Sequence, residues 1–150
     1  MAALASALAG HRLIALDTPV WIYHFEGSAA YGQAADSVLG RIAQGQIGAV
    51  ASELLLLELL VAPLKKGAQD VADEIELALL HFPNLRLAPI TRGVLVRAAE
   101  IRARYGLRTP DSIMVATAVD SGATLAVTND NAWRKVKEID VLLLSEVSRS

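Results

Sequence analysis

The sequence predicts one α/β domain built on a largely parallel, five-stranded sheet flanked by helices. Short apolar runs alternate with longer helical stretches along its 150 residues, of which 53% are apolar and 5% aromatic. An apolar excess made mostly of Ala, Leu and Val favours helices packed on a sheet over an aromatic-rich β-sandwich. A chain of this length is the size of a single domain, and no internal repeat or linker divides it.

Five short apolar runs are expected to form the strands, because each has the length and composition of a buried parallel strand. They cover residues 13–16, 47–51, 85–88, 124–127 and 141–144. Helices are expected at residues 18–44, with an interruption at Gly27, and at 54–64, 69–81, 91–105, 111–119 and 131–137. Thr18, followed by Pro19, is a typical N-cap, and Ser52 is a second one.

Residues 1–10 are expected to be a leader of uncertain order in front of a domain that spans 11–150. The leader is small and apolar, and its Ala-Ser-Ala loosely resembles a signal-peptidase site, but it lacks a positively charged start. No apolar run reaches the roughly 18 residues that a membrane span needs. The chain has no cysteine, which suits a reducing compartment and predicts a cytoplasmic protein without a membrane partner.

Four isolated acids carry the functional prediction: Asp17, Glu58, Asp111 and Asp130. Helix N-termini and the carboxyl ends of parallel strands meet at one edge of such a sheet, and open α/β sheets bind their ligands there. Asp17 ends the first strand, Asp130 follows the fourth, and Asp111 lies in the first turn of its helix. Glu58 lies one to two turns into its own helix. All four are therefore expected to face one pocket.

Each acid also has an ordinary structural explanation. Asp17 can begin a turn, Asp111 can complement a helix dipole, and Asp130 can cap a helix. Glu58 has no such structural explanation, because it lies in the middle of a run of leucines, too far from the helix start to gain from the dipole. We therefore interpret Glu58 as functional, and the neighbouring Glu53 as structural.

Carboxylates in apolar surroundings are costly to desolvate unless a positive charge compensates them. No Lys or Arg follows the pattern of the four acids, whereas a divalent cation would compensate them together. Oxygen ligands of this kind suit Mg²⁺ or Mn²⁺, bound as one ion or two. Such an ion can activate water and stabilise charge on a phosphoryl oxygen, so the acids indicate phosphodiester hydrolysis.

From about residue 13 to residue 144, the chain resembles a PIN domain, and within that family the VapC-type toxins of toxin–antitoxin pairs. The order and spacing of four segments carry the resemblance. They are Leu16-Asp17-Thr18 with Val20-Trp21-Ile22-Tyr23, Ser52 with Glu58-Leu59-Leu60, Thr109-Pro110-Asp111 with Ala116-Thr117-Ala118, and Thr128-Asn129-Asp130 with Trp133. Trp133 departs from the pattern, in which Phe is more usual.

The resemblance implies a Mg²⁺- or Mn²⁺-dependent endoribonuclease that leaves a 5′-phosphate and a 3′-hydroxyl. It also implies a homodimer that a cognate antitoxin inhibits. Matched residue by residue, Asp17 and Asp111 correspond to the principal metal ligands. Glu58 and Asp130 complete the acidic cluster, acting directly or through water, and Thr18 and Thr128 support the carboxylates.

Two other functions stay open at this point. One is a PIN-fold binding module without catalysis, and the other is a different acid-centred α/β phosphohydrolase or switch. A haloacid-type phosphatase would need a second Asp two residues after Asp17, where Pro19 stands. The net charge of −2 excludes RNA binding through overall charge alone. Among the arginines around residues 92–108, Arg108 is the best candidate for contacting an RNA phosphate, because it is so near Asp111.

Overall fold

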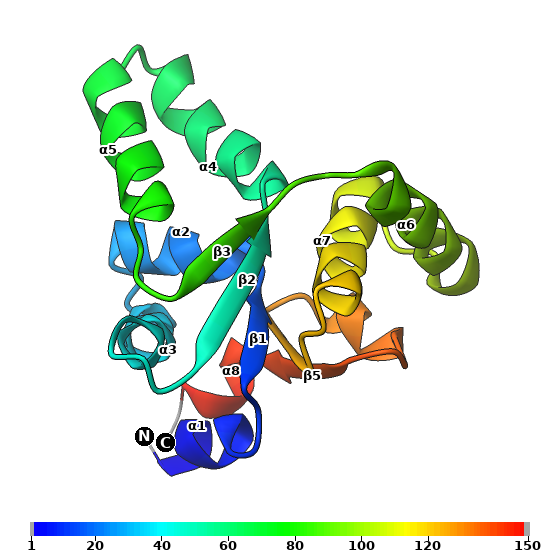
Figure 1. The fold of residues 1–150 in the computed structure, drawn as a ribbon. Helices are drawn as coiled ribbons and strands as arrows, with labels where there is room; N and C mark the ends of the chain where they lie inside the picture. Colours follow the sequence, from blue (N-terminus) through cyan, green and yellow to red (C-terminus); the bar gives the residue numbers. More distant parts are fainter. Residues whose placement is uncertain (1, 149–150) are drawn as a thin grey trace.

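All five strands run parallel, in the order β3-β2-β1-β4-β5, in the computed structural model (Figure 1). The model describes residues 2–148. The strands are β1 Leu13–Leu16, β2 Gly48–Ser52, β3 Leu85–Ala88, β4 Leu125–Thr128 and β5 Asp140–Leu143. The predicted fold class is confirmed, and the limits of β2, β4 and β5 move by one residue from their predicted positions.

The helices connect the strands as the sequence predicts. They are α2 Thr18–Glu26, α3 Gly32–Ala43, α4 Leu54–Lys65, α5 Gln69–Leu80, α6 Arg92–Tyr105 and α7 Thr109–Asp120, with the 3-10 helix η1 Asn131–Lys135 after β4. The expected helix over residues 18–44 divides into α2 and α3 because Gly27 ends α2 in the left-handed conformation, at φ 64°. This conformation costs glycine little, since it has no Cβ.

The strand order reverses between β1 and β4. The chain passes from β1 outward to β2 and β3, and then returns through α6 and α7 to place β4 on the other side of β1. In open parallel sheets, such a reversal leaves a crevice at the carboxyl ends of the two central strands. Asp17, directly after β1, and Thr128, at the end of β4, both lie at this point.

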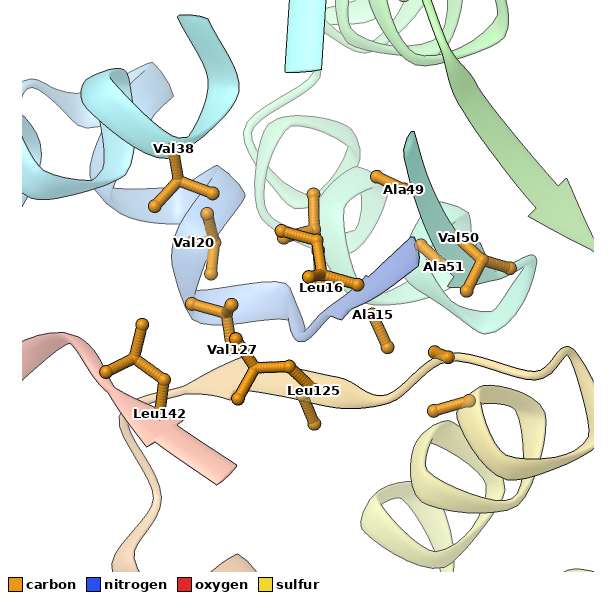
Figure 2. Close-up of a cluster of buried hydrophobic side chains, with 14 of the residues drawn as sticks. Ala15, Leu16, Val20, Val38, Ala49, Val50, Ala51, Leu125, Val127 and Leu142 are labelled. Atoms are coloured by element: carbon orange, nitrogen blue, oxygen red, sulfur yellow. The ribbon is translucent and has the colours of Figure 1, made fainter. Parts of the chain in front are cut away.

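Helices cover both faces of the sheet. Figure 1 shows α2 and α3 on one side and α7, with α6 outside it, on the other side. Side chains of β1 alternate between the two faces, so that Leu16 lies with Val20 and Val38 while Ala15 points the other way (Figure 2). These residues belong to one buried cluster that fixes β1 and hence the position of Asp17.

The start of α2 corrects one prediction. Asp17, not Thr18, is the N-cap, and its Oδ1 accepts a 2.8 Å hydrogen bond from the backbone N–H of Thr18. Thr18 is the first helical residue, and its hydroxyl is used in a contact to another helix. The local capping preference of Thr is therefore overridden by a tertiary hydrogen bond.

Both ends of the domain carry a short helix outside the predicted elements. Residues 1–10 were expected to be of uncertain order, but α1 spans Ala2–Leu8, and its Leu4 and Leu8 are buried in the main core. At the other end, α8 covers Leu144–Val147 directly after β5. Across residues 2–148, no helix is both long and apolar enough to span a bilayer.

Candidate metal centre

Asp17 is a buried carboxylate at the crevice between β1 and β4. Its side chain is 5% exposed, and its backbone N–H donates to Val127 O of β4 at 3.0 Å. Oδ2 accepts a 2.7 Å hydrogen bond from the hydroxyl of Thr128, while Oδ1 accepts the Thr18 N–H. One carboxylate oxygen is thus held by the end of β4 and the other by the start of α2.

The electrostatics of Asp17 are unfavourable for an anion. The pKa of Asp17 is raised from 3.8 to about 7, mainly by burial and in smaller part by the nearby charges of Asp111 and Glu58, against the lowering effect of its two hydrogen bonds. Within residues 2–148, no Lys, Arg or His forms an ion pair with Asp17, Glu58 or Asp130. The ionised site therefore has uncompensated negative charge.

Asp111 comes from α7, on the opposite side of the crevice. It lies in the first turn of that helix, after Pro110, and is 9% exposed. The first-turn position is also the one that the helix dipole favours for an acid. Its Oδ2 lies 3.2 Å from Nε of Arg108, whose side chain is 79% exposed. Asp111 therefore combines a buried carboxylate with a solvent-exposed basic partner.

Glu58 reaches the site through Thr18. The Thr18 hydroxyl donates a 2.6 Å hydrogen bond to Glu58 Oε1, and the Glu58 side chain is half-buried in the leucine-rich helix α4. Because Thr18 directly follows Asp17, this bond brings the carboxylate of α4 beside the end of β1. This position lies where the sequence places Glu58, and its functional role stays a prediction.

Asp130 is the acid with the fullest local explanation. Its side chain accepts from the N–H of Ala132 at 2.9 Å and so caps η1. Its own N–H donates to Thr128 Oγ1 at 3.1 Å, and that same hydroxyl donates to Asp17. Asp130 is therefore linked to the site through Thr128.

Asn129 is a site neighbour to which sequence analysis assigned no role. Its Nδ2 donates to the hydroxyl of Tyr23 on α2 at 3.2 Å, and its Oδ1 accepts from Ser145 N of α8 at 3.0 Å. These bonds anchor the segment that carries Thr128 and Asp130. Its position between Thr128 and Asp130, two predicted site residues, was the signal in the sequence that could have indicated a role for Asn129.

The donor set fits a hard divalent cation. In the described part of the chain, no three acidic or imidazole side chains converge into a ready-made cage for an ion. Mg²⁺, however, is usually held by one or two carboxylates together with several waters. Buried Asp17, with Asp111 and Glu58 close enough to raise its pKa, supplies oxygen ligands and the negative charge that such an ion would neutralise.

Comparison with known proteins identifies the domain and its fold. The PIN domain family model matches residues 14–139, whereas no curated protein matches the sequence. The fold is similar to that of a toxin–antitoxin complex from Klebsiella pneumoniae, at 20% identity and a TM-score of 0.67, over 87% of this chain and 97% of that chain.

Two further solved structures share the fold. DNA-bound VapBC from Salmonella typhimurium is 14% identical with a TM-score of 0.67, covering 89% of this chain and 98% of that one. FitAcB from Neisseria gonorrhoeae is 20% identical with a TM-score of 0.66, covering 86% and 96%. At these identities, the likeness establishes the fold alone.

Proposed function

We propose, from the premise that the chain belongs to the PIN domain family, that it is a Mg²⁺- or Mn²⁺-dependent endoribonuclease. The observation that carries the proposal is the buried Asp17 carboxylate, which has two acidic neighbours and no basic partner among the described residues. A buried carboxylate without a basic partner contributes nothing to the packing of the fold. A bound cation would compensate its charge.

Each residue has a definite task in this proposal. Asp17 and Asp111 would hold the ion, and Glu58 and Asp130 would complete its surroundings directly or through water. When bound, the ion activates water and stabilises charge on the phosphoryl oxygen. Thr128 and Thr18 fix the orientation of Asp17 and Glu58 through their short hydrogen bonds. Such positioning matters because phosphodiester hydrolysis depends on alignment of the reacting groups.

Two alternatives predict other behaviour. A PIN-fold binding module would have no need of buried, mutually repelling carboxylates, so their presence supports an active nuclease. For a different acid-centred phosphohydrolase, Thr18 and Pro19 follow Asp17 where a haloacid-type phosphatase has its second acid. Membership of the PIN family also favours a nuclease over this second alternative.

The proposal is tested by incubating the pure protein with a mixed cellular RNA pool in Mg²⁺, Mn²⁺ or EDTA. We expect metal-dependent cleavage that leaves 5′-phosphate ends and is lost in Asp111→Asn. Asp140→Asn is the matched control, because Asp140 is an exposed acid at the start of β5, the opposite edge of the sheet. Cleavage that continues in EDTA, or in Asp17→Asn and Asp111→Asn, would contradict the proposal.

We further propose that the chain is the toxin of a cytoplasmic toxin–antitoxin pair and forms a homodimer. The similarity of the fold to that of the toxin–antitoxin complex from Klebsiella pneumoniae supports this role. Apolar surface for partners is also present: Leu57, Val61 and Leu64 are 44–61% exposed along one face of α4. Other residues of α4 line a groove of about 350 Å³ between α2, α4 and α5, to which Phe25 and Val71 also contribute.

The partner proposals have their own tests. Induced expression of the chain alone should arrest growth of a bacterial host, and Asp111→Asn should not. Light scattering should give a mass near twice 15.9 kDa for the isolated protein. If the wild-type protein cleaves RNA but does not arrest growth, the nuclease proposal stands and the toxin role is contradicted.

A further inference from the structure

We propose that Arg108 is an exchangeable counter-ion: it pairs with Asp111 in the metal-free protein and passes to an RNA phosphate when a cation binds that carboxylate. This inference rests on the proposed function, since it concerns how the same site changes between its metal-free and metal-bound states. It adds a competition between an arginine of the chain and the metal ion for one carboxylate.

The geometry of Arg108 suits an exchange. Its Nε lies 3.2 Å from Asp111 Oδ2, yet its side chain is 79% exposed, whereas that of Asp111 is 13% exposed. The backbone is fixed at the start of α7, where the carbonyl of Arg108 accepts from Ser112 N at 2.9 Å. The guanidinium can therefore swing away through solvent while its point of attachment stays beside the site.

The energetics favour the cation. An ion pair with one exposed partner contributes little to stability, because water screens it and the long side chain loses freedom when it forms. A divalent ion has twice the charge of the guanidinium and also compensates the buried Asp17, which Arg108 does not contact. Release of Arg108 is therefore inexpensive, and the freed guanidinium is a bidentate phosphate ligand next to the metal.

Arg108 is distinguished from its neighbours by its partner. Arg97 pairs with Asp120, Arg104 pairs with Glu138, and Arg102 donates to the carbonyl of Leu107. None of these three contacts involves an acid of the proposed metal centre. Arg108 pairs with a carboxylate of the proposed metal centre, so its position is coupled to the binding of a cation there.

The exchange predicts effects of opposite sign on two ligands. Arg108→Gln removes a competitor and a positive charge beside the ion, so metal affinity should rise by about two- to five-fold, the range of an exposed ion pair. The same change removes one phosphate contact, so RNA affinity should fall and the slope of log K against log salt should decrease by about 0.7 for a single strand.

Metal affinity is measured by calorimetric titration of the full chain with Mn²⁺. Arg12→Gln is the control, because Arg12 lies just before β1, at the sheet edge away from the site, and its loss changes the net charge equally. Tighter binding in Arg108→Gln, with Arg12→Gln unchanged, supports the exchange. Equal or weaker binding in Arg108→Gln overturns it. If Asp17→Asn binds Mn²⁺ as the wild type does, the proposed metal centre itself fails, which is a separate result.

RNA affinity is measured by fluorescence anisotropy with a labelled uridine 20-mer, confirmed intact on a gel, in EDTA and in Mn²⁺. Arg108→Gln should weaken RNA affinity several-fold in Mn²⁺ and only slightly in EDTA, where Arg108 of the wild type stays paired with Asp111. Arg108→Lys, which keeps the charge, should restore part of the affinity. An equal loss of RNA affinity in both conditions would show a fixed phosphate contact and overturn the exchange.

Discussion

The hydroxyl of Thr18 donates a 2.6 Å hydrogen bond to Glu58 Oε1, joining the first turn of α2 to the middle of α4. The two residues are 40 positions apart, and the bond places a carboxylate of a leucine-rich helix beside Asp17. It also explains how a polar group is tolerated there, because a part-buried carboxylate needs a donor.

Thr18→Val should therefore destabilise the fold and uncouple Glu58. A hydrogen bond to a charged group contributes about 1.5–3 kcal/mol, so we expect a loss in this range, reduced by solvent access to Glu58. Urea unfolding of Thr18→Val, Glu58→Gln and the double variant measures the interaction. A coupling energy of at least about 0.5 kcal/mol is expected. Strictly additive effects would mean that the bond contributes nothing.

Thr128→Val tests the hydroxyl that links Asp17 and Asp130. Thr128 is fully buried, donates to Asp17 at 2.7 Å and accepts from Asp130 N at 3.1 Å. Valine has nearly the same shape but leaves both groups without this partner, which should cost about 1–3 kcal/mol in unfolding free energy. RNA cleavage should fall as well, and Thr128→Ser should restore much of both. Equal behaviour of the Val and Ser variants would contradict the role of the hydroxyl.

The raised pKa of Asp17 predicts the pH dependence of stability in EDTA. Because the pKa of Asp17 is about 7 in the folded state and 3.8 is its ordinary value, the folded state binds more protons between these pH values. The contribution of protonated Asp17 to the free energy of unfolding is therefore complete below about pH 4. It is lost as pH rises to about 7, at up to about 1.4 kcal/mol per pH unit.

Asp17→Asn isolates this effect, because asparagine cannot ionise and keeps the size of the side chain. Near pH 8 in EDTA, the variant should be more stable than the wild type, and the advantage should disappear toward pH 4. Urea unfolding across this range gives the difference directly, with Asp140→Asn as the control. A difference independent of pH would show that Asp17 is not protonated in the folded state.

Leu4→Ala tests whether α1 belongs to the folded domain. Leu4 is fully buried in the main core, so its truncation should cost about 2–5 kcal/mol. Ala2→Ser changes an exposed position of the same helix and should cost little. Thermal unfolding of the two variants decides the matter. A Leu4→Ala protein as stable as the wild type would make α1 a dispensable leader.

The sequence was most informative where buried strands end. The runs before Asp17 and after Thr124 are uniformly apolar, so parallel strands and the edge that carries the acids could be placed without a structure. The segments on which the family resemblance rests contain these same acids. Asp111 was placed through its Thr-Pro helix start, a local signal that does not depend on packing.

Tertiary contacts account for what the sequence left open. Residues 1–10 are weakly patterned, and the burial of Leu4 and Leu8 depends on a pocket made by distant elements. Thr18 has the pattern of a cap, but its hydroxyl is used by Glu58, so Asp17 caps the helix instead. The pairing of Arg108 with Asp111 depends on a side-chain conformation that spacing alone does not determine.

The most direct test of the metal centre is thermal unfolding of wild type and Asp17→Asn near pH 8, in EDTA and then in Mn²⁺. Without metal, Asp17→Asn should unfold at the higher temperature, because the wild type carries the buried charge. With saturating Mn²⁺, the order should reverse, since binding stabilises only the protein that holds the ion. An unchanged order, with the wild type unaffected by Mn²⁺, would contradict a metal site at Asp17.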